Sequence, residues 1–381
     1  MKLTVKKSKI ESAVKNICRV INNKNALPIL GDIMCSVNEQ DKTLTLLGSD
    51  SEVWLKYMLE LEEAEGSGDF CIGAKLLLSA LTELKDQPLE IITDTENVDI
   101  ALLRIIHETG NTNLPLDNAD EYPRPQEFGQ DATMWYVDPT VIKRVVKRTM
   151  YATGNDDLRP VMSGVFFDHK EGAMNIVASD GHQLIRTKIQ DTNEMIDGQM
   201  NMPKKAAKML PELLAYPEED TSILFNETTA SVEHGNMTLQ FRLIEGKYPN
   251  YGSVIPKDSP YSLTADRRAM LTAVRNVAHF TSSSHMIEME ISGNQKMTLH
   301  GNDYDFSTTS KDSIDIEYAQ SKDMTIGVLS DSVIEALSRL TEAEFELQFT
   351  SPDRAMIITP VDPVYDNEEI TMLLMPMLVN E

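Results

Sequence analysis

The hydrophobic pattern of the chain repeats three times. The stretches 44–50, 174–180 and 297–303 each alternate apolar and polar residues, which is the pattern of a half-buried strand. Each stretch then ends in Gly or Ala, a small polar residue and aspartate. The aspartates lie roughly 125 residues apart, which is the length of one domain and far longer than a solenoid repeat. The chain is therefore predicted to contain three copies of one domain.

Each copy opens with a short strand and an amphipathic helix. The three segments with this pattern are 3–21, 135–153 and 262–280. Apolar residues recur in them at helical spacing, as at Val14, Ile17 and Ile21 in the first. In the second, Asp138 and Pro139 are typical of an N-cap and a first helical residue. A strand followed by a helix is thus expected at the start of every copy.

A second strand and helix follow in each copy, in the segments 70–85, 200–216 and 324–340. Pro211 is expected to shorten or kink the middle helix. Alternating stretches with turn residues lie between the helices and predict antiparallel strands. The fold class is therefore α+β, with two helices on one face of the sheets in each domain. Pro-rich segments mark the boundaries, and the predicted domains are 1–128, 129–257 and 258–381.

The composition is that of a globular protein with a strong acidic surplus. The chain has 60 acidic and 35 basic residues, a net charge of −25, which disfavours wrapping nucleic acid or anionic lipid over the outer surface. Cys18, Cys35 and Cys71 have no CxxC spacing, so we expect reduced core thiols. The N-terminus has no apolar signal region and no apolar run is long enough to span a membrane. A cytoplasmic location is expected.

The basic residues gather on the predicted helices. Lys143 and Lys147 are one of several like-charged pairs four residues apart, which cost helix stability. One interpretation is a solvated helix face. The other is a surface that meets a polyanion through its phosphates, without sequence readout. The cations expected on such a surface are Lys143, Arg144, Lys147, Arg148, Lys208, Arg268 and Arg275.

Five short motifs then occur in a fixed order. They are LPIL (27–30), SGVFF (163–167), SDGHQL (179–184), EGKYPNY (245–251) and MPML (375–378). With these motifs and the triple repeat, the whole chain resembles the bacterial sliding clamp family, the beta subunit of DNA polymerase III. The resemblance implies a head-to-tail homodimer that closes a ring around duplex DNA.

In such a ring, helices from both chains line the hole. Twelve helices at a spacing of roughly 8–10 Å leave a hole at least roughly 22–28 Å wide, enough for a duplex with water around it. The resemblance places Lys24, Lys75, Lys204 and Lys205 at DNA-contacting positions, whereas Ala74 stands where a basic residue is common. Leu114 and Leu116, facing Phe280 of the other chain, are candidate dimer contacts. No cofactor and no metal are expected.

The family docks short peptides of the replicative polymerase, the clamp loader and repair proteins in an apolar groove between the second and third domains. The matching positions here are Met162, Ser179, Gly181, His182, Gln183, Leu184, Pro249, Val254, Leu373, Met375, Pro376, Met377 and Leu378. Methionine suits this role because it repacks around different ligands. Gln183, Ser253 and Leu378 stand at positions that are often basic in the family, so the preferred peptide is expected to differ. The stretch 369–380 is also consistent with a final core strand.

Two other functions compete with that of a clamp. His182 next to Asp180 allows a hydrolase or transferase, although no set of nucleophile, base and orienting group accompanies the pair. An acidic scaffold that binds only proteins is the third possibility. The pattern favours a non-catalytic, DNA-encircling interaction hub.

Overall fold

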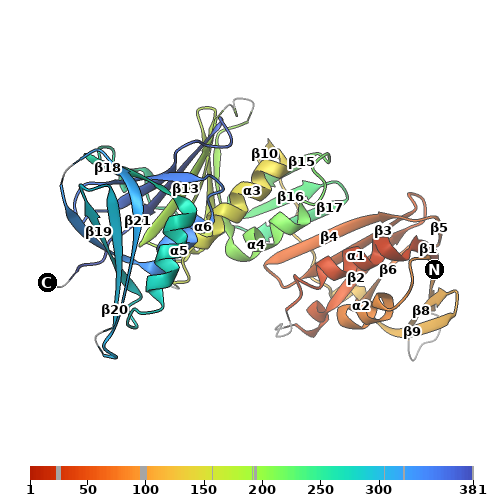
Figure 1. Ribbon diagram of the computed structural model, residues 1–381. Helices are drawn as coiled ribbons and strands as arrows, with labels where there is room; N and C mark the ends of the chain where they lie inside the picture. The colour runs from red at the N-terminus through yellow and green to blue at the C-terminus, as the bar shows by residue number, and fades with distance from the viewer. Residues whose placement is uncertain are drawn as a thin grey trace. The chain divides into compact units, whose positions relative to one another are not determined.

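The computed structural model describes residues 1–22, 27–94, 101–156, 158–190, 192, 195–303, 305–320 and 322–379. The chain divides into two compact units (Figure 1). The first contains Met1–Ile142 and Met209–Leu243, and the second contains Lys143–Lys208 and Ile244–Glu381. The domain boundaries at 128 and 257 stay a prediction.

The first unit is built on one antiparallel sheet. Among the described residues it has 13 strands in the order β10-β15-β16-β17-β4-β3-β2-β6-β9-β8-β7-β1-β5. The bounds are β1 (Lys2–Lys6), β2 (Asp32–Asn38), β3 (Thr43–Ser49), β4 (Val53–Glu60), β5 (Glu63–Glu65), β6 (Gly68–Gly73), β7 (Pro88–Asp94), β8 (Leu102–His107), β9 (Gly110–Asp117), β10 (Thr133–Tyr136), β15 (Thr221–Phe225), β16 (Thr229–His234) and β17 (Met237–Arg242).

The second unit repeats this plan. Its described residues form a 12-stranded antiparallel sheet in the order β14-β11-β12-β13-β25-β24-β23-β18-β21-β20-β19-β22. The bounds are β11 (Gly164–Lys170), β12 (Ala173–Ser179), β13 (Gln183–Ile189), β14 (Gly198–Pro203), β18 (Tyr261–Asp266), β19 (Met286–Ser292), β20 (Lys296–Asp303), β21 (Thr308–Tyr318), β22 (Met324–Leu329), β23 (Glu344–Phe349), β24 (Met356–Pro360) and β25 (Glu368–Leu374).

The helices follow the strands as the sequence predicted. They are α1 (Lys7–Ile17), α2 (Ala74–Thr82), α3 (Pro139–Thr149), α4 (Lys204–Leu213), α5 (Arg267–Ala278) and α6 (Ser330–Ser338). Asp138 caps α3, because its carboxylate accepts the backbone N–H groups of Thr140 (2.7 Å) and Val141 (3.3 Å). Pro211 lies inside α4, near its C-terminal end. The α+β fold class with antiparallel sheets is confirmed.

The triple repeat of the sequence is also a repeat of local structure. Asp50, Asp180 and Asp303 each accept two backbone N–H groups from the residues two and three positions later. These Asx turns connect β3 to β4, β12 to β13 and β20 to β21. A Cβ on Gly48 would lie 2.1 Å from Ile17, and one on Gly301 would lie 2.3 Å from the carbonyl oxygen of Val277. The glycine in the first and third motifs therefore lets the first helix of that copy approach the sheet closely.

The apolar stripes predicted for the helices face the core. Val14 and Ile17 of α1 and Val274 and Val277 of α5 are fully buried. Cys35 and Cys71 are buried, Cys18 is half-buried, and all three are free thiols. No helix in the described parts of the chain combines the length and the apolar character that crossing a membrane requires.

Candidate functional site

A sharp turn in the second unit contains one group of the predicted partner-binding residues, those from Ser179 to Leu184. Gly181 lies in it with φ +93°, a conformation that side-chain-bearing residues rarely adopt. The hydroxyl of Ser179 donates to the carbonyl oxygen of Gln183 (2.8 Å) and accepts the N–H of Gly181 (3.1 Å). The amide of Gln183 donates to the second carboxylate oxygen of Asp180 (3.1 Å). The turn is thus held by its own side chains.

A small buried cluster lies behind this turn. Phe166 and Tyr248 stack with their ring centroids 4.4 Å apart. They pack with Val177, Leu184 and Leu373, and Leu184 lies opposite Leu373 where β13 pairs with β25. Burial raises the pKa of the Tyr248 phenol well above its usual range. The cluster gives the turn and the end of β25 a common apolar support.

Apolar side chains that lie close in sequence to members of this cluster remain exposed. Val254 is 54% exposed, Met375 43% and Leu378 79%. The backbone N–H of Met375 donates to the carbonyl oxygen of His182 (2.8 Å), which brings the end of β25 to the turn. Exposed apolar groups that sit on an ordered support are typical of a protein-binding surface.

The other predicted residues divide into two groups. A Cβ on Gly154 would lie 3.4 Å from the carbonyl oxygen of Met162 and 3.6 Å from Asp180 Cα, so Met162 lies near the turn. Pro249 is exposed and follows the buried Tyr248. Met377 instead continues toward β22, where its N–H donates to the carbonyl oxygen of Gly327 (2.8 Å). These positions stay predictions for the binding site.

The predicted DNA-facing cations differ in their exposure and in their contacts. Exposed side chains belong to Lys75, Lys143, Lys147, Lys208, Arg268 and Arg275. Lys204 and Lys205 are half-buried, and the ammonium of Lys204 donates to the Asn155 side chain (2.8 Å). Lys24 lies outside the described residues. The exposed helical cations stay candidates for phosphate contacts.

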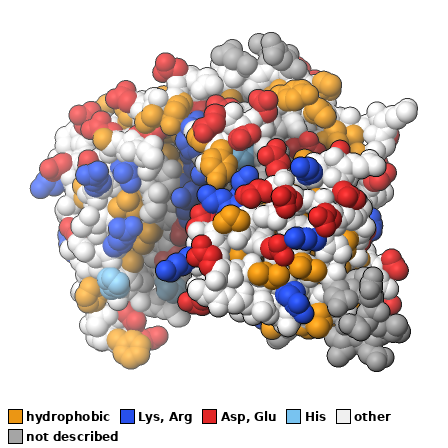
Figure 2. Space-filling view, turned by 90° about the vertical axis from the view of Figure 1, so that its right-hand side faces the viewer, with side chains coloured by type: hydrophobic (Ala, Val, Ile, Leu, Met, Phe, Trp, Pro, Cys, Tyr) orange, Lys and Arg blue, Asp and Glu red, His pale blue; other side chains and the backbone are white. Residues whose placement is uncertain are grey.

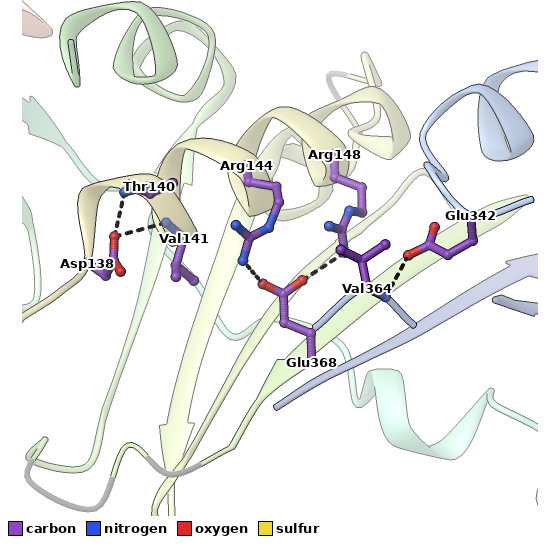
Figure 3. Close-up of polar contacts among 8 residues, drawn as sticks. All are labelled: Asp138, Thr140, Val141, Arg144, Arg148, Glu342, Val364 and Glu368. Carbon is purple, nitrogen blue, oxygen red and sulfur yellow. Dashed lines mark hydrogen bonds and ion pairs between the residues drawn. The ribbon is translucent and has the colours of Figure 1, made fainter. Parts of the chain in front are cut away.

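Arg144 and Arg148 are engaged inside the second unit instead (Figure 3). Both form ion pairs with the buried carboxylate of Glu368 on β25, and the distance from Arg148 is 3.2 Å. The Arg144 guanidinium also lies 3.6 Å above the Tyr365 ring. Because Arg148 is buried, this triad binds α3 to β25, and we leave both arginines out of the proposed DNA-facing set.

Two surface hollows occupy matching places in the fold. One, of about 260 Å³, is lined by Pro28, Gly31 and Lys75 among others. The second, of about 340 Å³, is lined by Pro160, Ser163 and Lys204 among others. Each lies where a 3₁₀ helix (Pro28–Gly31 or Pro160–Ser163) meets the start of a second helix. A lysine of the predicted DNA-facing set therefore stands at each hollow.

Acidic residues outnumber basic residues in the chain, 60 to 35. Figure 2 shows Asp and Glu spread over the face it draws, with Lys and Arg among them.

Within the described residues, no group of three or more His, Cys, Asp or Glu side chains is placed to hold a metal ion. The carboxylate of Asp180 is engaged by the backbone and side chain of its own turn, which favours a structural role over a catalytic one.

Family models for the DNA polymerase III beta subunit match the chain in three successive parts. The N-terminal domain model matches residues 1–125, the central domain model 136–250 and the C-terminal domain model 252–378. The chain belongs to the DNA polymerase III beta subunit family. The three domain models also agree with the triple repeat in the sequence.

Known proteins of this family are similar over their full length. The beta sliding clamp of Pseudomonas putida KT2440 is 22% identical over 381 residues, covering 99% of this chain and all of that protein. The beta sliding clamp of Bacillus subtilis 168 is also 22% identical and covers 99% of both chains. A Pseudomonas aeruginosa sliding clamp bound to griselimycin has a TM-score of 0.90, 20% identity and full coverage of both chains. The beta subunit fold therefore extends through the whole chain.

Sequence reasoning did not single out the aromatic support of the site. Phe166 and Tyr248 both lie inside motifs that were recognised, SGVFF and EGKYPNY, but neither was assigned a role. Arg159 was not singled out either; its guanidinium donates to the carbonyl oxygen of Asp180 (3.4 Å) and pairs with Asp156 (3.1 Å). Tyr248 could have been found from its place next to Pro249.

Proposed function

We propose that this chain is a DNA sliding clamp. Two copies form a ring around duplex DNA, and the ring tethers the replicative polymerase and other partners through the apolar surface beside the Ser179–Leu184 turn. The observation that carries this proposal is the triple repeat of one domain together with family membership along the whole chain. The clamp performs no catalysis and acts in the cytoplasm.

The physical mechanism is topological. A closed ring needs no tight DNA site, and diffuse Lys and Arg contacts to phosphates are equivalent at each step along the duplex. The exposed side chains of Lys143 and Lys147 on α3 suit this role. The net charge of −25 discourages DNA from binding elsewhere on the surface.

Retention on circular and linear DNA tests the ring. The clamp is loaded with its loader and ATP onto nicked circles, and half of the sample is then cut once with a restriction enzyme. We expect the clamp to stay on circles and to leave cut DNA within minutes. Equal loss from both would refute topological retention.

The partner surface is tested by Met375→Ala combined with Met377→Ala. Loss of these flexible apolar side chains should abolish stimulation of the polymerase, while sedimentation still shows a dimer. Met134→Ala, at an exposed methionine on β10, is the matched control. Stimulation that survives in the double variant would show that the surface is assigned wrongly.

The cationic helices are tested through salt dependence. Lys143→Ala combined with Lys147→Ala should weaken DNA binding equally for all sequences and lower the salt slope by about 1 for each phosphate that is no longer neutralised. Lys170→Ala, an exposed lysine at the end of β11, is the control. An unchanged slope in the double variant would remove α3 from the DNA-facing surface.

A further inference from the structure

Each of the three copies opens with a strand that leads to its first helix: β1 to α1, β10 to α3 and β18 to α5. Leu3, Trp135 and Leu263 occupy the same place in these strands, because each is buried and lies four residues before its helix begins. The neighbours on one side also agree. β1 pairs with β7, β10 with β15 and β18 with β23, which is the strand after the second helix in every copy. The three opening strands can therefore be compared residue by residue.

The other edge of the opening strand differs between the copies. In the first copy β5 pairs with it, and Leu3 lies opposite Ala64. In the third copy the end of β21 pairs with it, and Leu263 lies opposite Tyr318. Among the described residues, β10 pairs with β15 alone and is the last strand of its sheet. The second copy therefore leaves one edge of its opening strand unpaired.

The chain's own segment at this place is bound elsewhere. β5 lies in the connection between β4 and β6, and residues 190–197 form the equivalent connection between β13 and β14. The N–H of Thr192 donates to the carbonyl oxygen of Gly172 (3.0 Å). The carboxylate of Asp197 accepts the N–H of Glu171 (3.1 Å). These contacts hold the described part of the connection at the turn between β11 and β12.

The open edge of β10 carries backbone groups that can pair. The N–H of Val137 donates to the carbonyl oxygen of Thr221 (3.0 Å), and backbone groups alternate in direction along an antiparallel strand. The N–H and C=O groups of Met134 and Tyr136 therefore point away from β15. The Met134 side chain is 39% exposed and that of Tyr136 74%. Residues 133–136 include neither the lysine nor the proline with which natural proteins protect such edges.

The segments that build this part of the sheet carry only acidic charge. Residues 125–142 and 209–241, which supply β10, β15 and β16, contain no Lys or Arg. Their exposed acidic residues include Asp131, just before β10, and Glu219 and Asp220, just before β15. Charge complementarity at this edge favours a basic occupant and disfavours nucleic acid.

We propose that β10 receives an extended basic segment of a protein partner as an added antiparallel strand. The first copy already pairs opposite charges across the equivalent edge, where Lys2 of β1 lies opposite Glu65 of β5. Backbone hydrogen bonds supply affinity in this kind of recognition, and the Tyr136 ring offers a cation–π contact to Lys or Arg of the segment. β10 belongs to the first unit and the Ser179–Leu184 turn to the second, so this inference does not depend on the proposed function.

Peptide binding to the full chain tests the added strand. The probe is a fluorescent peptide of alternating lysine and valine, about eight residues long, which is an ordinary strand length. The comparison peptide has the same sequence with every backbone nitrogen methylated, so it keeps the charge and loses its donors. We expect the first peptide to bind at least about 5-fold more tightly in fluorescence anisotropy. Equal binding of the two would show only a general attraction between charges and would overturn the proposal.

A proline on the edge tests the position. Met134→Pro removes an N–H that points away from β15, a place where edge strands tolerate proline. The loss of one backbone bond should weaken binding of the unmethylated peptide by about 2- to 13-fold. Met134→Ala keeps the N–H and should bind normally. Urea unfolding and retention on circular DNA should be unchanged in both variants. An unchanged peptide affinity in a folded Met134→Pro variant would refute this role of β10.

Charge reversal decides the question if the proline variant does not fold. Asp131→Lys combined with Asp220→Lys should weaken peptide binding by about 5-fold, and by less as the salt concentration rises. Glu39→Lys combined with Asp41→Lys, at the exposed turn between β2 and β3, is the matched control. Equal binding to both double variants would contradict a basic occupant.

Sedimentation tests the alternative occupant, a second copy of this chain. We expect the state of association to be the same in the parent and in Met134→Pro. Association in the parent that Met134→Pro abolishes would show that another copy pairs with this edge, and would overturn the assignment to a basic partner.

Discussion

The chain contains the same strand junction twice, where β4 pairs with β17 in the first unit and where β13 pairs with β25 in the second, and the proposed partner surface lies at the second junction. In the second unit, Leu184 and Leu373 face each other below the Gly181 turn, with Met375 and Val254 exposed nearby. In the first unit, Trp54 and Gln240 occupy the corresponding opposed positions, and Trp54 is buried. The same backbone thus supports an open apolar surface in one place and a filled core in the other.

In the first junction, neighbouring side chains bury Trp54. Trp54 packs with Leu30 and Tyr122, which correspond to Met162 and Tyr248 in the second unit. Leu30 is fully buried, whereas Met162 is half-buried. The side-chain amide of Gln240 donates to the carbonyl oxygen of Gln126 (2.6 Å), so the following linker covers this junction. Side-chain volume and linker path therefore decide which junction can receive a partner.

The largest change in the free energy of unfolding should come from breaking the ion pairs of Glu368 with Arg144 and Arg148 in the second unit. Glu368→Ala leaves the buried Arg148 without its partner, so we expect the free energy of unfolding to fall by about 3–5 kcal/mol. Urea denaturation measures it. Glu369→Ala removes the neighbouring, more exposed partner of Arg186 and should cost less than about 1 kcal/mol. Equal losses in both variants would show that the triad does not stabilise this junction.

A smaller side chain at Trp54 in the first junction should lower the free energy of unfolding by somewhat less. Trp54→Leu removes part of a buried indole, and we expect a loss of about 2 kcal/mol in the free energy of unfolding. Met58→Ala, at an exposed residue of the same strand, is the control and should change little. If both variants unfold at the same urea concentration as the parent, Trp54 does not fill this junction as described.

Filling the second junction is the reverse experiment. Leu184→Trp should overpack the buried cluster beneath the turn, and we expect partner peptides to bind at least about 10-fold more weakly, or about 1.4 kcal/mol. Fluorescence anisotropy with a labelled peptide from the polymerase measures the loss. Leu184→Met conserves volume and should bind normally. Undiminished binding to the Trp variant would separate the peptide site from this cluster.

The smallest effect on stability should come from the carboxyl of Asp32, which has no counterpart in the second unit. Burial, and then Asp117, raises the pKa of the Asp32 carboxyl to about 6, whereas Gly164 and Ile244 meet at the corresponding place. The folded state holds this proton more tightly than the unfolded chain. Its stabilisation is therefore present below about pH 4 and lost as the pH rises through about 6.

Asp32→Asn should therefore raise the free energy of unfolding at pH 7.5 by about 1 kcal/mol, reduced by solvent screening at this half-buried site. At pH 4 the variant and the parent should be nearly equal. Urea unfolding at both pH values measures the difference. A variant that is less stable at pH 7.5 would contradict the raised pKa.

Much of the fold followed from local pattern. The strand and helix pairs, the cap at Asp138 and the three aspartate turns were predicted or marked by the sequence, because each depends on neighbours within a few residues. The binding residues were predicted only through resemblance to a family. Phe166 and Tyr248 were not, since their stacking joins segments about 80 residues apart that no local period connects.

The sequence alone predicted that one domain occurs three times, because the same pattern of apolar and polar residues recurs in it three times. That pattern decides which side of each strand or helix faces a core. Only the tertiary structure decided which of the cations on α3 pair with Glu368. Arg144 and Arg148 have the same spacing on α3 as Lys143 and Lys147, yet they are the pair that meets Glu368. A helical period fixes which residues share a face, but a partner more than 200 residues away decides what that face contacts.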